Sequence, residues 1–264
     1  MTVKRISGAL LGILLLASII FEFFPYHSYE EQFRDAISAP PSVRFWLGTD
    51  ALGRDRAARL VYGTRVSLLL AVAAAGLSVA FATAAGTSAG FVGGYWSTTL
   101  LSVADLFLCV PWFFLLTAIR GAMPLNTSPL VSVLMTFGLL GVLGWAGPAR
   151  VLSLRTRQVV ETDYIRQARA TGASQWRILV RHVLPNILPI AASQFWILVP
   201  AYIITEANLS VLGLGVSEPL PSWGSLLKEI DFVQWGSPGI LLPLVLLAAV
   251  AGTLQFAFNS EESH

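Results

Sequence analysis

Six arginine side chains are concentrated in one stretch of the chain, residues 155–189, where only Glu161 and Asp163 oppose them. The six are Arg155, Arg157, Arg166, Arg169, Arg177 and Arg181. Arginine side chains act through their positive charge. On a binding surface, such charges steer association with a partner more than they add affinity. In a chain that is otherwise strongly apolar, we expect this stretch to be displayed outside the lipid bilayer.

The sequence lacks the motifs that would make the chain an enzyme. The phosphate-binding pattern GxxxxGK[ST] does not occur, and Lys4 and Lys228 are the only lysines, so we expect no binding of ATP by this chain itself. The three histidines are scattered, no HExxH motif occurs, and the single cysteine, Cys109, excludes a cysteine cluster for metal. We therefore predict no catalytic residue, no metal site and no cofactor in this chain.

The composition indicates a membrane protein. Hydrophobic residues make up 55% of the 264 residues and charged residues only 12%, about half the share in ordinary soluble domains. A helix needs roughly 20 apolar residues to cross a bilayer. The runs of suitable length are residues 6–24, 66–95, 98–121, 128–149, 187–209 and 240–258. We predict an all-α polytopic membrane protein with about six transmembrane helices.

Three parts are expected along the chain. Residues 1–65 hold the first transmembrane helix and an external loop with a short amphipathic helix at residues 55–62, residues 66–258 form the transmembrane domain, and residues 259–264 are a short cytoplasmic tail. Basic residues at the start of the first apolar run favour cytoplasmic termini, although the first loop also carries arginines. That run also fits a signal peptide, but it lacks a clear cleavage site, so a retained span is favoured.

The basic stretch is predicted to be a helix–turn–helix. An apolar stripe at roughly 3.6-residue spacing marks the first helix, Gly172 ends it, and Ser174 is the expected N-cap of the second. The stripe consists of Val159, Tyr164, Ile165 and Ala168, and the second helix carries Trp176, Ile178, Leu179 and Val183. Pro185 either stops the second helix or marks the entry to the next span.

Small residues inside the predicted spans indicate close helix packing. A repeat every four residues is formed by Ala82, Gly86, Gly90 and Gly94. In lipid, helices associate where small side chains let their backbones approach. A second series permits close approach or a bend, and it consists of Gly138, Gly141, Gly144 and Gly147. Pro111 is expected to kink the third span, because proline removes a backbone donor.

Two acidic residues, Asp105 and Glu206, lie within predicted spans or close to them. A charge at membrane depth costs about 2.5–3.5 kcal/mol on the insertion scale. These side chains therefore line a translocation path, form hydrogen bonds between helices, or lie near the interface. Trp223 and Trp235 are expected in the aromatic belt at the membrane surface.

Three stretches in order resemble the signatures of one permease family. The run YIRQARATGASQWRILVRHVLPN resembles the cytoplasmic EAA loop of bacterial ABC importer permeases, with Gly172, Leu184 and Pro185 at its spacing and Ala168 at its second alanine. The runs LGTDALGRDRAARLVYGTRVSL and LSVLGLGVSEPLPSWGSLL resemble signatures of the dipeptide/oligopeptide/nickel subfamily, and the order looks like its C-type subunit. The loop departs from the pattern at three positions, and the usual tail is replaced by LQFAFNSEESH. The three positions are Arg166, Gln167 and His182.

The resemblance implies a heterodimeric pore in the bacterial inner membrane. This chain would pair with a homologous permease, two cytoplasmic ATPase subunits that bind ATP and Mg²⁺, and an external solute-binding protein, without nucleic acid. The residues expected to couple to the ATPase are Tyr164, Arg166, Ala168, Ala170, Gly172, Ala173, Trp176, Arg177, Arg181 and Pro185, with Ile178 as a further apolar contact. An external gate or binding-protein contact is expected at Gly48, Asp50, Gly53, Arg54, Asp55, Pro221, Trp223 and Gly224.

The substrate implied by the resemblance is a dipeptide or oligopeptide, with nickel as the alternative within the same family. A different class, an ATP-independent channel or secondary carrier, has no need of a protruding docking hairpin. A membrane-embedded enzyme is the third alternative, and the sequence offers no converging acid, base or metal groups for it.

Overall fold

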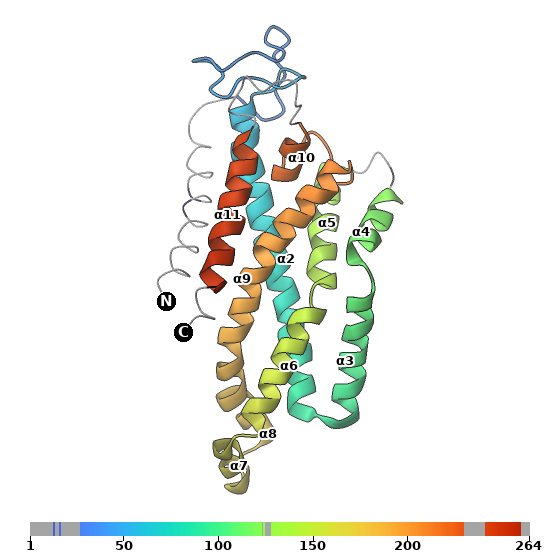
Figure 1. Ribbon diagram of the computed structural model, residues 1–264, viewed down its shortest axis with the longest axis vertical. Helices are drawn as coiled ribbons and strands as arrows, with labels where there is room; N and C mark the ends of the chain where they lie inside the picture. Colours follow the sequence, from blue (N-terminus) through green and yellow to red (C-terminus); the bar gives the residue numbers. More distant parts are fainter. Residues whose placement is uncertain are drawn as a thin grey trace. The chain divides into compact units, whose positions relative to one another are not determined.

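The computed structural model describes residues 27–122, 124, 128–229 and 241–259, together with residues 13 and 16. Within these residues every regular element is a helix (Figure 1). The helices are α2 (Arg56–Val92), α3 (Gly94–Cys109), α4 (Trp112–Gly121), α5 (Pro129–Leu143), α6 (Ala146–Val160), α7 (Asp163–Ala170), α8 (Gln175–Ile178), the π-helical turn η2 (Leu179–Val183), α9 (Leu184–Val211), α10 (Trp223–Lys228) and α11 (Leu242–Asn259). The all-α prediction is confirmed.

Three helices in the described part of the chain are long and apolar enough to cross a membrane. They are Arg56–Val92, Pro129–Val160 and Gln175–Val211, and the bent pair Gly94–Cys109 and Phe113–Gly121 adds a fourth if it is one span. These agree with four of the expected runs, and α11 covers the range expected for the last. The expected first span, residues 6–24, lies outside the described residues apart from residues 13 and 16, so the number six stays a prediction.

One local prediction was wrong, and the kink predicted at Pro111 is confirmed as a break. The separate amphipathic helix expected at residues 55–62 does not form, because α2 begins at Arg56 and continues without a break to Val92. Nothing in this stretch interrupts a helix, and Arg59 within it is fully buried. Pro111 does more than kink the third span, because α3 ends at Cys109 and the next helix departs at 69°.

The chain divides into two compact units, each built from several segments. Unit 1 comprises Met1–Val72, Thr117–Phe137 and Val199–His264, and unit 2 comprises Ala73–Leu116 and Gly138–Leu198. Each unit carries one of the two groups of candidate functional residues. The basic hairpin belongs to unit 2, and the residues expected at an external gate belong to unit 1.

Unit 2 is held together by the small-residue stripe of α2. An ideal Cβ atom added to Gly86 would lie 2.4 Å from the carbonyl oxygen of Ala149, and one added to Gly90 would lie 2.5 Å from that of Ser153. The backbone of α6 therefore lies directly against α2, and α3 packs on α6 as well. The packing role is confirmed for Ala82, Gly86 and Gly90, whereas Gly94 is the first residue of α3 and has open space around it.

The glycine series of residues 138–147 provides both close approach and a bend. A Cβ at Gly141 would lie 2.9 Å from the Leu77 side chain of α2, so the glycine permits contact there. The hydroxyl of Ser78 donates a hydrogen bond of 2.7 Å to the Gly141 carbonyl. The helix is interrupted at Gly144 and Trp145, between α5 and α6.

Candidate functional site

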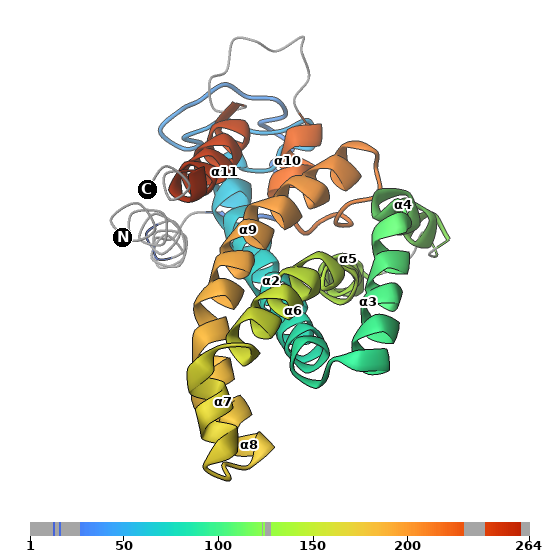
Figure 2. The same ribbon diagram turned by 60° about the horizontal axis from the view of Figure 1, so that its bottom comes forward.

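The basic stretch forms a tight hairpin of two short helices, α7 and α8, but its boundaries differ from those we predicted. The apolar stripe from Val159 to Ala168 belongs to two helices, because α6 ends at Val160 and α7 begins at Asp163. No glycine or proline marks this break, so the periodicity of apolar residues predicted one continuous helix across it. We refer to residues 163–178 as the α7–α8 hairpin; it lies at the end of unit 2, beyond α6 and the start of α9 (Figure 2).

The turn of the hairpin has the predicted chemistry. Gly172 has a φ of 79°, a left-handed conformation that glycine adopts without steric cost. The amide of Ala173 donates to the carbonyl of Ala168 at 3.0 Å, and the amide of Gly172 donates to that of Arg169 at 3.0 Å, which is a Schellman motif. The Ser174 hydroxyl then caps α8 by accepting from the Arg177 amide at 3.3 Å. Both predictions about this turn are confirmed.

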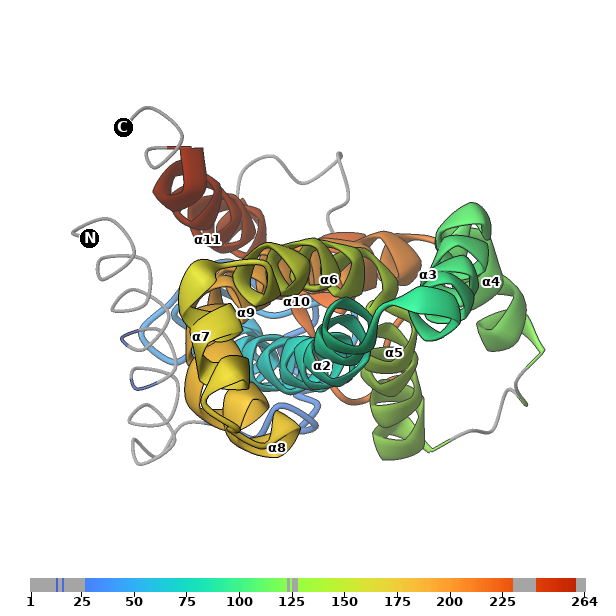
Figure 3. The ribbon, with the colours of Figure 1, turned by 90° about the horizontal axis from the view of Figure 1, so that it is seen from below.

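Two isoleucines anchor the hairpin to unit 2. Ile165 of α7 and Ile178 of α8 are completely buried in one core with Val159, Val183 and Ile187. Burial of a side chain of this size contributes about 1.5–3 kcal/mol, so the hairpin is a fixed part of the unit. Seen from below, α7 and α8 lie side by side next to the ends of α6 and α9 (Figure 3). Ile178 is therefore not available to a partner, and its predicted role as an exposed apolar contact was wrong.

The outer surface of the hairpin combines aromatic and basic side chains. Trp176 is 72% exposed and Tyr164 is 43% exposed. Further exposed positions are Arg166, Ala170, Gly172, Arg177, Arg181 and Pro185, whereas Ala168 and Ala173 are partly buried. A Cβ atom added to Gly172 would meet no atom within 4 Å. Exposed tryptophan surrounded by arginine is the composition of a protein-binding surface.

A π-helical turn joins the hairpin to α9. Residues Gln175 to Val211 form one helix of 37 residues, and the turn at Leu179–Val183 is wound more widely than an α-helix. Pro185 lies directly after this turn, in the first turn of α9. Proline has no amide hydrogen and clashes with the carbonyl four residues earlier, and a wide turn relieves that conflict. Pro185 thus marks the entry to the next helix and does not stop the preceding one.

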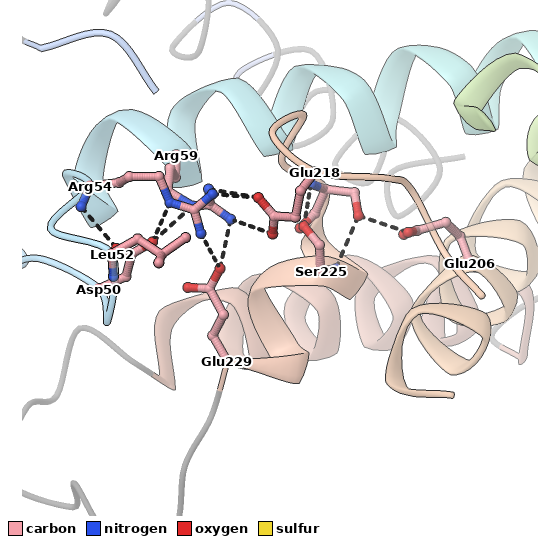
Figure 4. Close-up of polar contacts among 9 residues, drawn as sticks. Asp50, Leu52, Arg54, Arg59, Glu206, Glu218, Ser225 and Glu229 are labelled. Atoms are coloured by element: carbon pink, nitrogen blue, oxygen red, sulfur yellow. Dashed lines mark hydrogen bonds and ion pairs between the residues drawn. The ribbon is translucent and has the colours of Figure 1, made fainter. Parts of the chain in front are cut away.

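Unit 1 contains a cluster of five charged residues from three separate segments, Asp50, Arg54, Arg59, Glu218 and Glu229, which we call the ion-pair cluster (Figure 4). Asp50 accepts from the Arg54 Nε atom at 2.6 Å. The Arg59 guanidinium donates to Glu229 at 2.6 Å and to Glu218 at 3.3 Å. Arg54 also donates to Glu218 and lies 3.5 Å from Glu229.

Local turn chemistry holds the first segment of the ion-pair cluster. Asp50 Oδ1 accepts from the backbone amides of Leu52 and Arg54 at 2.9 and 2.8 Å, which is an Asx-type turn. Gly53 follows with a φ of 75°, and a Cβ there would lie 2.3 Å from the Phe33 carbonyl oxygen. The backbone amides fix the Asp50 carboxylate, and this carboxylate orients the Arg54 guanidinium. The orientation of Arg54 is therefore set by local contacts as well as by the distant glutamates.

The two glutamates of the ion-pair cluster differ in their pKa. Burial raises the pKa of the Glu218 carboxyl, but attraction by Arg59 and Arg54 outweighs burial, so the pKa lies below its ordinary value. Burial also raises the pKa of the Glu229 carboxyl, and Arg59 offsets only part of this, so that pKa lies above its ordinary value. Asp50 and Glu218, as negative neighbours, push the pKa of Glu229 in the same direction as burial.

Glu206 fixes the start of α10 to α9 within unit 1. Its side chain is fully buried and accepts from the hydroxyls of Ser210 and Ser222, each at 2.7 Å, and from the Gly224 amide at 3.3 Å. Ser222 is also the N-cap of α10, in a capping box with Ser225. Of the three roles considered for Glu206, its described contacts fit hydrogen bonding between segments.

Trp223 is buried inside unit 1 and does not face lipid, so the aromatic-belt prediction was wrong for this residue. It is 0% exposed, its indole nitrogen donates to the Thr64 hydroxyl at 2.9 Å, and its amide donates to the Ser67 hydroxyl at 2.9 Å. Trp235 lies outside the described residues. The residues expected at an external gate are all buried, and they are Gly48, Asp50, Gly53, Arg54, Asp55, Pro221, Trp223 and Gly224. They are part of the interior of unit 1, so only their more exposed neighbours are accessible to a partner.

Sequence reasoning missed the partners of the charged residues. Asp105 of α3 pairs with Arg150 of α6 at 3.0 Å inside unit 2, which fits an ion pair between helices. Arg120 is almost buried in unit 1, where it donates to the Leu214 carbonyl at 2.8 Å and to the Ser132 hydroxyl at 2.7 Å. The available signal was that arginines inside apolar runs need a buried partner, but their partners are far away in sequence.

Comparison with known proteins agrees with this architecture. The model of the family "binding-protein-dependent transport system inner membrane component" matches residues 79–260. The oligopeptide transport system permease protein OppC of Mycobacterium tuberculosis is 34% identical over 222 residues, covering 84% of this chain and 75% of the relative. The OppC protein of Haemophilus influenzae is 30% identical over 246 residues, covering 90% and 77%.

A dipeptide transport system permease protein, DppC of Bacillus subtilis, is 33% identical over 220 residues, covering 83% of this chain and 67% of the relative. The fold and these matches define an integral membrane permease, the non-catalytic class of transport component. The chain belongs to the family of binding-protein-dependent transport system inner membrane components, among the ABC permeases of the dipeptide/oligopeptide/nickel group. The resemblance of the three sequence signatures is thereby confirmed.

Proposed function

We propose that this chain is one permease subunit of an ATP-driven, binding-protein-dependent importer of dipeptides or oligopeptides. It pairs with a homologous permease to form the pore, and two cytoplasmic ATPase subunits bind and hydrolyse ATP with Mg²⁺. An external solute-binding protein delivers the peptide. This chain itself carries no catalytic residue or cofactor in the proposed cycle.

The α7–α8 hairpin is the observation that carries this proposal. Its inner side is fixed by the buried Ile165 and Ile178, and its outer side presents the exposed Trp176 within a rim of arginines. A fixed projection of this kind transmits the movement of a docked ATPase to α9, because η2 joins the hairpin directly to that helix. Closure of the ATPases on ATP would then bias the pore between outward and inward access.

Peptide is the proposed substrate class because related permeases are named for it, OppC for oligopeptide and DppC for dipeptide transport. The test compares uptake of labelled dipeptide and labelled nickel in bacterial cells with and without the gene, with ATP then depleted. Loss of ATP-dependent peptide uptake alone is expected. Loss of nickel uptake alone would replace the substrate, and unchanged uptake of both would remove the importer proposal for these substrates.

The proposed location is the bacterial inner membrane, with both termini and the α7–α8 hairpin in the cytoplasm. A cysteine introduced at the exposed Gln175, in a Cys109→Ser background, is expected to resist a membrane-impermeant thiol reagent in intact cells and to react after permeabilisation. Labelling in intact cells would reverse the orientation.

A further inference from the structure

A cavity of about 600 Å³ lies within unit 1, beside the ion-pair cluster. Sites for small ligands occupy about 300–1,000 Å³, so its size suits a molecule of a few residues. Its charged lining consists of three acids, Asp50, Glu218 and Glu229, and three bases, Arg54, Arg56 and Lys228. Equal numbers of both signs make the cavity complementary to a ligand that carries one charge of each sign.

The acidic side of this cavity is held in position before any ligand arrives. Glu229 is fixed by the Arg59 guanidinium at 2.6 Å, and Glu218 is fixed by the same group and by Arg54. Arg59 is fully buried and is not part of the lining, so it supports the glutamates from behind. Each carboxylate has two oxygens and about four acceptor positions, which leaves capacity for an ammonium group on the cavity side.

The basic side of the cavity offers a cation that no described acid neutralises. Lys228, the last residue of α10, is exposed, and within the described residues no carboxylate lies at ion-pair distance from its ammonium group. Its Nζ atom lies 3.7 Å from the position of a Cβ atom at Gly213, on the loop that also carries Glu218. The flexible lysine side chain can therefore meet a carboxylate held near the glutamates.

A metal cation does not fit this lining. Imidazole is the side-chain ligand that suits nickel, whereas carboxylate and carbonyl oxygens suit magnesium, calcium and manganese, and the cavity has no histidine in its lining. Three positively charged side chains around the same space would also repel a divalent cation. A simple anion is disfavoured for the converse reason, since the three carboxylates repel it.

We propose that the cavity binds the zwitterion of a short peptide, with its α-ammonium group at Glu218 and Glu229 and its carboxylate at Lys228. The proposal rests on the proposed peptide importer and adds a peptide-binding site in the permease itself. The site binds the two charged termini, which every linear peptide has, so we expect it to accept peptides with different side chains. The hydroxyl of Ser225, in the same lining, is a further hydrogen-bonding group for the peptide backbone.

The test uses the complete complex of both permeases and both ATPases in lipid nanodiscs, without the solute-binding protein. Binding of dialanine, N-acetyl-dialanine and dialanine amide is measured by saturation-transfer NMR. The wild-type complex is expected to bind dialanine about tenfold more tightly than either capped form, which is about 1.4 kcal/mol.

Variants separate the two ends of the ligand. Lys228→Met is expected to abolish the preference for dialanine over its amide and to keep the preference over the N-acetyl form, and Glu229→Gln is expected to do the reverse. Asp35→Asn, which breaks an exposed ion pair with Arg44, is the control and should bind as wild type. A structural defect would weaken all three ligands together and would not produce this crossed pattern.

The outcome also separates the site from the transport function. If the full system takes up peptide but the complex binds none of the ligands, or if both variants keep both preferences, the zwitterion site is overturned and the importer stands. If peptide uptake itself is absent, the importer proposal falls as well. Lys228→Met keeps the test sharp should Glu229→Gln fail to fold, because Lys228 is outside the ion-pair cluster.

Discussion

Glu206 accepts a hydrogen bond of 2.7 Å from the hydroxyl of Ser222, sixteen positions further along the chain, and both side chains are completely buried. Ser222 caps α10, and the loop between the two residues carries Glu218, so this one contact positions the cavity wall. An acidic residue in an apolar helix therefore acts here as an acceptor for three donors from neighbouring backbone and side chains.

Replacement of Glu206 by leucine is expected to destabilise unit 1 strongly. It leaves the donors of Ser210, Ser222 and Gly224 without their acceptor, and each buried unsatisfied group costs about 1–3 kcal/mol. Glu206→Gln keeps one oxygen acceptor and should show a smaller loss, and Ser210→Ala, which removes a single donor, about 1 kcal/mol. Thermal unfolding of the detergent-purified complex checks this order. Equal midpoints for Glu206→Leu and wild type would refute the role of Glu206 as an anchor.

Replacement of Gly86 by alanine tests the close approach of α2 and α6. The added Cβ would lie 2.4 Å from the Ala149 carbonyl oxygen, so the helices must separate at a cost of about 1–3 kcal/mol. Gly76→Ala is the matched control in the same helix, because its Cβ meets no atom within 4 Å. We expect a lowered unfolding midpoint for Gly86→Ala alone. A midpoint raised by both changes would show that only the higher helix propensity of alanine acts and that α2 and α6 leave room at Gly86.

Local signals in the sequence predicted a good part of this structure. The stripe of Ala82, Gly86 and Gly90 identified the packing face, because its four-residue spacing is a property of one helix. Gly172 and Ser174 identified the hairpin turn, because left-handed backbone and N-capping are decided within a few residues. The apolar runs identified three helices of spanning length and one bent pair of helices for a similar reason.

The remaining features depend on contacts that no local pattern contains. Arg59 is buried because Glu218 and Glu229 reach it across 159 and 170 positions of sequence. The indole of Trp223 is buried because its nitrogen finds a hydrogen-bond partner in Thr64, a residue 159 positions away in the sequence. A position at the membrane surface was expected for Trp223, and its tertiary partners overturned that expectation. The break between α6 and α7 was missed because no helix-breaking residue accompanies it.

Replacement of Trp176 by alanine separates docking from folding. Trp176 is 72% exposed and Ile178, two residues later, is completely buried. Trp176→Ala should leave thermal unfolding unchanged but weaken capture of the ATPase at least about tenfold, since buried aromatic anchors contribute about 2 kcal/mol or more to interfaces. Ile178→Ala should instead lower stability by about 2–5 kcal/mol. Trp46→Ala, an exposed tryptophan before α2, is the control. Wild-type capture by Trp176→Ala would exclude Trp176 from the docking surface.

Two substitutions of Gly172 separate the effect of backbone strain from the effect of a steric clash with the docked ATPase. Within the described residues, a Cβ atom added there meets no atom within 4 Å, but the φ of 79° disfavours most residues. Asparagine tolerates this conformation, so Gly172→Asn should fold and retain part of the ATPase capture. Gly172→Trp should reach the membrane in normal amounts and lose capture, because its bulk would occupy the docking site. Pull-down of the ATPase at wild-type yield with Gly172→Trp would remove the hairpin turn from the interface.

The two glutamates of the ion-pair cluster should respond to pH in opposite directions. The pKa of Glu218 is below the ordinary value of 4.5, so its contribution to stability is complete above that pH and is lost as pH falls through the lowered pKa. The pKa of Glu229 is above 4.5, so its contribution is complete below 4.5 and is lost as pH rises through the raised pKa. The charged groups that pair with these carboxyls or line the same cavity are Asp50, Arg54, Arg56, Arg59 and Lys228.

These signs predict different pH profiles for Glu218→Gln and Glu229→Gln. At pH 7, Glu218→Gln should destabilise by about 1 kcal/mol or less, because the side chain is half exposed, and the difference from wild type should shrink as the pH falls below 4.5. Glu229→Gln should gain stability relative to wild type as the pH rises from 4.5 to 7, because glutamine resembles the protonated acid. Unfolding midpoints of both variants from pH 4 to 7.5 measure this. Parallel profiles would show that the arginines do not distinguish the two carboxyls.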